Sequence, residues 1–269
     1  MNRVLLALLV LAPALAVADE KPAKPRRLYL RAGVLHMAPL ESSREMELAD
    51  IDGAASLAVE NGPIAGSGAT VDSATMPALI IGYRLPYLNG RLSLETILAL
   101  PFTVKFHATG TIATESLAPM ALGIPTGVKP LGPELGEAKA IPPLITAVYD
   151  LVPRGPVRPY AGAGVAVMLT TSPKVTNPIL TEVREPDMHI SPAPGLVLQG
   201  GVEARITNRI YARLDVKFIA FMLARAEVNH IVVKTPELPL FETAEVGTAK
   251  MSMWINPLIL QAGIGADFW

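Results

Sequence analysis

The sequence predicts an all-β protein: an eight-stranded, antiparallel, up-and-down transmembrane β-barrel with long extracellular loops and short periplasmic turns. Three observations carry this prediction. First, 51% of the 269 residues are hydrophobic, slightly more than the roughly 45–50% of an ordinary globular domain. Second, 25 prolines and 21 glycines are spread along the chain and interrupt helices repeatedly. Third, after residue 18 no apolar run approaches the ~20 residues that a transmembrane helix needs.

The first segment indicates export. Arg3 precedes a continuous apolar run over residues 4–11, and Ala16-Val17-Ala18 forms a small-x-small cleavage site. This order is typical of a secretory signal peptide; the alternative is a retained membrane anchor. We assign residues 1–18 to the signal peptide, residues 19–27 to a polar N-terminal leader and residues 28–269 to the barrel. An exported apolar chain without a spanning helix is either a soluble β-structure or a barrel that faces lipid.

Charge and residue content exclude several classes of function. The formal net charge is −1, so no broad basic surface is available for nucleic acid. The chain contains no cysteine, which excludes disulfides, thiolate catalysis and iron–sulfur clusters. Its four histidines are far apart in the sequence and lack metal-ligand spacing. We therefore expect no catalytic residues, no cofactor and no metal site, and we do not expect an enzyme.

Eight strand-like segments follow one another along the barrel region. Each is an apolar or alternating run bounded by turn or loop signals. They cover residues 28–37, 75–85, 91–106, 140–151, 158–169, 195–206, 210–226 and 251–269. The second segment ends near Asn89-Gly90, a strong hairpin-turn signal. The fourth and sixth end at short turns over residues 152–157 and 207–209.

The connections between these strands alternate in length. Residues 38–73, 107–139, 170–194 and 227–250 are polar or rich in glycine and proline, so we expect long loops there. The first of them leaves room for a short helix near residues 43–51. With an even number of strands, all long loops then lie at one end and both termini at the other. This is the arrangement of bacterial outer-membrane barrels, and we expect that location for the protein.

The two faces of the expected strands differ in polarity. Side chains alternate with period two, and along residues 210–226 one face is apolar while the other carries Arg213, Asp215 and Lys217. A cation that faces lipid at the bilayer midplane costs about 2–4 kcal/mol. The apolar faces should therefore meet lipid and the charged faces should line the lumen. The alternative is a soluble barrel whose apolar face points inward, which the alternation alone does not exclude.

Strand direction then divides the lumen into two halves. We expect a charged plug in the periplasmic half, formed by Arg31, Arg91, Glu95, Gln199, Glu203, Arg205, Arg213, Asp215, Lys217, Gln261 and Asp267. We expect a hydrophobic lumen in the outer half, formed by Leu35, Ile97, Val197, Ile219, Phe221, Leu223, Ile255 and Ile259. Eight strands leave an interior just wide enough for side chains, so ion pairs should close the lower half below an apolar cup.

Several segments resemble those of one known family. They read LYLRAG at 28–33, LETILALPFTVKF at 94–106, GTIA at 110–113, PPL at 142–144, RPYAGAG at 158–164 and NPLILQAG at 256–263. Together they resemble the OmpW family along the strands of most of the chain after the leader. The sequence departs from the family's pattern in the long segment 114–140 and in its ending, Asp267-Phe268-Trp269.

This resemblance implies a function and partners. It implies an outer-membrane barrel that binds small hydrophobic molecules in its outer lumen and allows their passive diffusion, with lateral exit into the membrane as one route. The implied partners are outer-membrane lipid, small hydrophobic solutes and the barrel assembly machinery. The alternative is a plugged structural or receptor barrel whose long extracellular loops bind partners.

Overall fold

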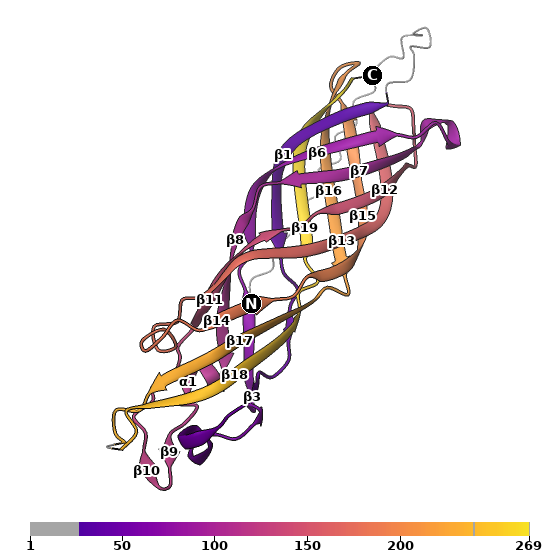
Figure 1. The fold of residues 1–269 in the computed structure, drawn as a ribbon. Coiled ribbons are helices and arrows are strands. Elements are labelled where there is room, and N and C mark those ends of the chain that lie inside the picture. Colours follow the sequence, from indigo (N-terminus) through magenta and orange to yellow (C-terminus); the bar gives the residue numbers. More distant parts are fainter. Residues whose placement is uncertain (1–26, 239, 269) are drawn as a thin grey trace, which may run out of the picture.

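Eight antiparallel strands close into a barrel, and Figure 1 shows their arrangement. The computed structural model describes residues 27–238 and 240–268, so the expected signal peptide and most of the leader lie outside the described residues. The barrel strands are β1 (Leu28–Ala38), β6 (Ala74–Arg84), β7 (Leu92–Ala99), β12 (Leu144–Asp150), β13 (Val157–Val175), β15 (Ala193–Arg205), β16 (Ile210–Ala220) and β19 (Leu258–Asp267). Neighbours pair in the order β12-β7-β6-β1-β19-β16-β15-β13, and β12 pairs with β13 to complete the circle. The predicted fold class is confirmed.

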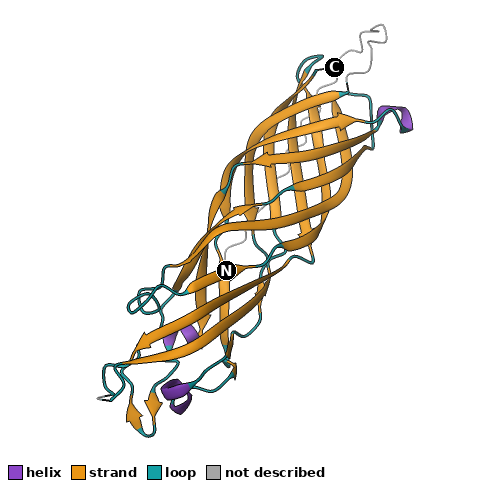
Figure 2. Ribbon diagram, viewed as in Figure 1, coloured by secondary structure: helices purple, strands orange, loops and turns teal. Residues whose placement is uncertain are grey.

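The long connections are not the irregular loops that the sequence predicts. They form a second β-structure, here called the extension, that continues the barrel at one end (Figure 2). One of its sheets consists of β5 (Ser67–Val71), β8 (Phe102–Gly110), β11 (Glu134–Ile141) and the far end of β13. The other contains β2 (Ser42–Ser43), β3 (Glu47–Ala49), β4 (Gly62–Pro63), β14 (Asp187–Ile190), β17 (Leu223–Lys234) and β18 (Thr243–Trp254). A small hairpin of β9 (Met120–Ala121) and β10 (Ile124–Pro125) completes it.

The helical segments of the described chain are short. A 3-10 helix, η1 (Gly53–Leu57), begins where the Asp52 carboxylate accepts a hydrogen bond from the backbone N–H of Gly53 at 2.6 Å. Residues 43–51, where the sequence leaves room for a short helix, supply β2 and β3 instead. The others are η2 (Leu88–Gly90) at the Asn-Gly turn and α1 (Thr111–Thr114). In the described part of the chain, no helix has the length and apolar character needed to cross a membrane.

Four of the expected strands are each divided into a barrel strand and an extension strand. Three divisions contain prolines, Pro101 between β7 and β8, Pro142-Pro143 between β11 and β12, and Pro257 between β18 and β19, and proline cannot donate to a strand ladder. Two divisions contain residues with left-handed backbone, Phe221 at φ 61° and Asn256 at φ 38°. Such residues bend a strand and re-aim its side chains.

The two faces of the barrel wall lie as the alternation predicts. Outward side chains are large and apolar, and Leu214, Leu198 and Ile264 are 60%, 58% and 58% exposed. Inward side chains of the same strands are almost fully buried, including Lys217 and Glu203 at 1% and 2% exposure. The charged residues are therefore inside the cylinder. The polarity is the reverse of that of a soluble barrel.

Candidate functional site

The lower interior of the barrel is filled by a network centred on Arg213 of β16. Its guanidinium lies 3.1 Å from a Glu95 oxygen, 3.0 Å from a Glu203 oxygen and 2.8 Å from an Asp215 oxygen. The ring of Tyr160 lies beneath it, 3.8 Å from the guanidinium carbon. These groups come from β7, β13, β15 and β16, so the network joins opposite sides of the wall.

Other cations complete the network. Arg31 contacts both Glu95 and Glu203, and Arg158 lies 2.8 Å from the second oxygen of Glu203. Lys217 lies 2.5 Å from Asp215. Each carboxylate thus meets at least two cations, which offsets the large cost of removing charge from water.

Neutral groups supply further hydrogen bonds. Gln199 donates to Asp215 at 2.8 Å, and the Lys217 ammonium donates to Gln261 at 3.0 Å. We define the plug as the charged residues and amides of this network: Arg31, Glu95, Arg158, Gln199, Glu203, Arg213, Asp215, Lys217 and Gln261. All are under 9% exposed, so the described side chains leave little room for water through the lower barrel.

Three tyrosines pack the plug against glycines on neighbouring strands. A Cβ atom on Gly82 would lie 1.9 Å from the Tyr29 ring, and one on Gly201 would lie 2.1 Å from the Tyr160 hydroxyl oxygen. Tyr211 covers Gly265 in the same way. The hydroxyl of Tyr29 donates to Glu95 at 2.8 Å, so this ring also orients a plug carboxylate. Glycine is required here because any side chain would occupy the volume of the ring.

Three residues expected in the plug lie elsewhere. Arg205 is exposed at the end of β15. Arg91 is half-buried and donates to the Tyr149 hydroxyl at 3.4 Å. Asp267 pairs with Arg84 at 3.2 Å. These residues stand at the strand ends. The wall no longer encloses Arg205 there, whereas the side chain of Asp267 is only 14% exposed and its partner Arg84 lies over the Tyr29 ring, so this pair borders the plug.

Sequence reasoning missed Arg158 and the three tyrosines. Arg158 is the direct cross-strand partner of Glu203, and it shares the inward face of β13 with Tyr160, so alternation along residues 158–169 already indicated its position. A signal was present for the tyrosines. Gly82, Gly201 and Gly265 stand at inward positions of otherwise bulky strands, and an inward glycine indicates that another side chain takes its space.

Above the plug lies a small apolar cavity of about 30 Å³, here called the lumen chamber. Its wall consists of Leu35, Met37, Met76, Ile97, Phe102, Pro142, Leu144, Met168, Ile219, Met222, Ile255, Pro257 and Ile259. The expected lumen residues Leu35, Ile97, Ile219, Ile255 and Ile259 are in this list. Val197 is also buried, at 1% exposure, but does not reach the cavity.

Two expected lumen residues are placed wrongly by the alternation. Phe221 is 68% exposed, and Leu223 is half-buried beside it. The left-handed backbone at Phe221 shifts the alternation by one residue, so Met222 enters the lumen chamber instead. A period-two pattern cannot register such a shift, because both Phe221 and Met222 are apolar.

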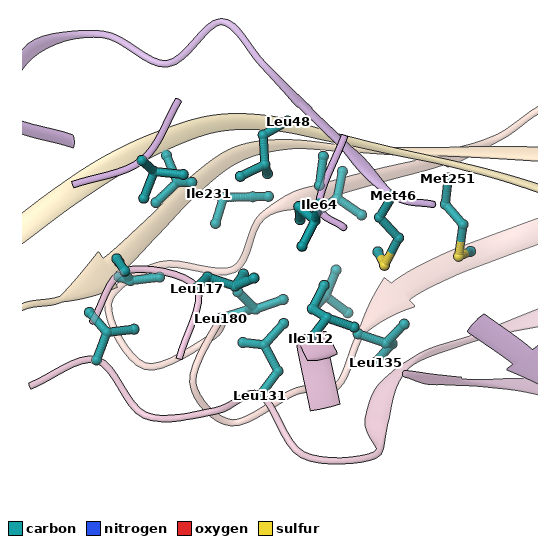
Figure 3. A pocket seen from close by; sticks show the side chains of 18 of the residues that line it. Met46, Leu48, Ile64, Ile112, Leu117, Leu131, Leu135, Leu180, Ile231 and Met251 are labelled. Carbon is teal, nitrogen blue, oxygen red and sulfur yellow. The ribbon is translucent and has the colours of Figure 1, made fainter. Parts of the chain in front are cut away.

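A larger apolar cavity of about 70 Å³ lies inside the extension, between its two sheets (Figure 3). We call it the extension chamber. Figure 3 shows side chains such as Leu48, Ile64, Ile112 and Leu180 converging on it from separate segments. Of the described residues in its wall, Lys129 alone is charged.

The hydrogen-bonded wall is interrupted beside the lumen chamber. β7 and β12 pair from Leu92 to Thr96, and β8 and β11 pair again from Phe102 onward. Within the described registers, residues 97–101 have no partners in 141–144, the segment that contains Pro142 and Pro143. Since Ile97, Phe102 and Pro142 line the lumen chamber, this interruption, here called the seam, lies between the chamber and the outside of the barrel.

Comparison with known proteins agrees with this architecture. The model of the OmpW family matches residues 28–268. The crystal structure of the outer membrane protein OprG from Pseudomonas aeruginosa is similar, with a TM-score of 0.66 and 20% identity over 91% of this chain and 97% of that chain. The NMR structure of E. coli outer membrane protein W shares 15% identity over 90% and 97% of the two chains, with a TM-score of 0.45. No curated protein matches the sequence.

Proposed function

The chain belongs to the OmpW family of outer-membrane barrels, and on this premise we propose that it binds small hydrophobic molecules in its apolar interior and lets them diffuse passively. The protein is located in the bacterial outer membrane. We place the extension on the outer side, because the long connections of such barrels are extracellular and the short turns periplasmic. The observation that carries the proposal is the order of its interior. Two apolar chambers lie above a plug in which every carboxylate is paired with cations.

The walls of both chambers suit binding without selectivity for one shape. Met37, Met76, Met168 and Met222 line the lumen chamber, and Met46, Met188 and Met251 line the extension chamber. Methionine is unbranched and adapts to irregular partners. Burial of apolar solute contributes about 0.8 kcal/mol per CH₂ group, so a short solute binds weakly enough to leave again.

We propose lateral exit through the seam. Straight passage requires opening a network of buried ion pairs, and removing one partner of such a pair costs about 3–5 kcal/mol. Passage through the seam breaks no ladder hydrogen bond between residues 97–101 and 141–144, since the described registers contain none there. An apolar solute that leaves this way enters the hydrocarbon region of the membrane directly.

Uptake of an apolar solute and of a sugar-sized polar solute tests the passage. Cells that produce the protein, or liposomes that contain it, should take up the apolar solute faster. Ile259→Asp places an ionised group in the lumen chamber and should abolish most of the difference, whereas Phe221→Asp, at an exposed position, should preserve it. Equal rates for both solutes would contradict the proposal and favour a plugged barrel whose extension binds partners.

A reversible cross-link tests the exit route. The chain has no cysteine, so Leu98→Cys with Pro143→Cys introduces one defined pair across the seam. Oxidation should slow apolar uptake, and reduction should restore it. Leu94→Cys with Ala147→Cys joins two residues that are already cross-strand partners and should leave uptake unchanged. Unchanged uptake with both pairs oxidised would contradict lateral exit through the seam.

A further inference from the structure

The extension chamber combines an apolar wall with one cation. Apart from Lys129, its described wall consists of aliphatic, phenylalanine and methionine side chains from β3, β8, α1, β11, β13, β14, β17, β18 and the intervening loops. The chamber is separate from the lumen chamber, with which it shares no wall residue. A purely apolar solute gains nothing from a lysine at this position.

Lys129 is placed there by a well-held backbone segment. The N–H of Val128 donates to the Thr126 hydroxyl at 3.2 Å, and that hydroxyl donates to the carbonyl of Ala118. The N–H of Gly132 donates to the carbonyl of Ala113 at 3.2 Å. These bonds tie both sides of Lys129 to the segment that supplies Ile112 and Leu117 to the wall. The position of the lysine is therefore fixed by the fold.

The charge of Lys129 is available to a ligand. The residue lines the chamber but is exposed overall, the arrangement of a lysine whose stem covers apolar surface while its ammonium stays in water. Among the described residues, the ion pairs of the extension involve other groups, such as Lys234 with Glu182 at 2.7 Å. Within the described wall, no carboxylate is present to neutralise Lys129.

We propose that the extension chamber is a binding site for amphipathic carboxylates, in which an alkyl chain occupies the apolar cavity and the carboxylate pairs with Lys129 at its mouth. The inference rests on the proposed function and narrows its substrate class. The extension chamber is the first site on the path of a solute, and Lys129 gives this site a preference for an anionic head group. Apolar burial supplies the affinity shared with neutral solutes. The ion pair supplies the difference between a carboxylate and the alcohol of equal chain length.

Calorimetric titration of octanoate and 1-octanol into the protein in nanodiscs of zwitterionic lipid tests the site, with empty discs subtracted. Lys129→Gln should weaken octanoate binding about five-fold, the scale of an exposed ion pair, and leave octanol binding unchanged. Lys129→Arg should retain the octanoate affinity. Lys105→Gln is the matched control, since this exposed lysine of β8 lies outside the chamber wall. It should change the affinity for neither octanoate nor octanol.

The outcomes separate this inference from the proposed function. If the Lys129→Gln variant binds octanoate with the affinity of the unmodified protein, the carboxylate site is refuted. Octanol binding would in that case still support the proposed function. An equal loss of octanoate affinity in the Lys105→Gln variant would indicate a general attraction of octanoate to surface lysines and would also overturn the inference. Binding of neither ligand to the unmodified protein would contradict both proposals.

Discussion

The lower and upper parts of the interior differ in the chemistry of the side chains that fill them. Below, Arg213 and its partners are held by directional, charge-assisted hydrogen bonds at 2.8–3.2 Å. Above, methionines and branched aliphatic side chains surround cavities of about 30 and 70 Å³. Directional bonds specify one arrangement and penalise any other, whereas apolar contacts are non-directional and tolerate rearrangement. The comparison teaches that the ion-paired lower interior is rigid and the apolar upper interior is adaptable, because their side chains interact in different ways.

The largest expected effect is on the plug. Arg213→Met leaves Glu95, Glu203 and Asp215 short of a cation, and breaking a buried pair in this way costs about 3–5 kcal/mol. The free energy of unfolding, measured by urea titration in lipid vesicles, should fall by that amount. Arg205→Met, at an exposed site, should change it by less than about 0.5 kcal/mol. Equal stability of the two variants would show that the plug is not rigidly paired.

A smaller loss is expected where the plug packs against the wall. Gly82→Ala would bring a Cβ atom within 1.9 Å of the Tyr29 ring and should destabilise the barrel by about 1–3 kcal/mol through overpacking. Gly200→Ala is the control, because its Cβ would lie 3.9 Å from the nearest atom, the Tyr160 carbonyl oxygen. The same urea titration compares them. An equally large loss of unfolding free energy in Gly200→Ala would indicate that the effect comes from the backbone freedom of glycine and not from a clash with the Tyr29 ring.

The upper interior should respond in function rather than stability. Met222→Leu nearly conserves volume, so it should change the free energy of unfolding by less than about 1.5 kcal/mol. The stiffer side chain should slow uptake of a branched or aromatic solute more than that of a linear one. Competitive uptake of the two solutes measures this ratio. An unchanged ratio would contradict an adaptable lumen chamber.

The smallest effect is a pH dependence in the extension. Desolvation raises the pKa of the Glu41 carboxyl above its ordinary value of 4.5, although Val71 donates a backbone hydrogen bond to it at 2.7 Å. A raised pKa in the folded state means that folding favours the neutral acid. Local stability should therefore fall as the pH rises from 4.5 through the raised pKa, and Glu41→Gln should flatten this dependence. Hydrogen exchange at residues 67–71, corrected for intrinsic rates, measures it.

The sequence alone was informative wherever one face of a strand had to avoid lipid. The inward placement of Arg31, Glu95, Arg213, Asp215 and Lys217 follows from alternation and from the cost of a charge in hydrocarbon. The strand ends at the short turns lie within two positions of expectation, because Asn89-Gly90 and the other short turns are local signals. The strand ends toward the extension differ from expectation by up to seven positions.

Tertiary structure decided what alternation leaves ambiguous. The extension looked like loops because its strands are interrupted by glycine and proline, and only pairing between distant segments, such as β3 with β18, gives them partners. Phe221 and Met222 are both apolar, so the sequence pattern does not show which of them faces the lumen. The left-handed backbone at Phe221 turns Met222 inward. The pairing of β13 with β15 placed Arg158 directly opposite Glu203.

The amino-acid order by itself thus determined the fold class, the lipid-facing surface and the charged character of the lower lumen, since each follows from local periodicity and the energetics of ions in a bilayer. The ion-pair partners, the two chambers and the interrupted ladder beside Pro142 were decided by the closed barrel and its extension. Contacts between residues 60 to 180 positions apart, such as Arg31 with Glu95 and with Tyr211, exist only once the strands are in register around the circle.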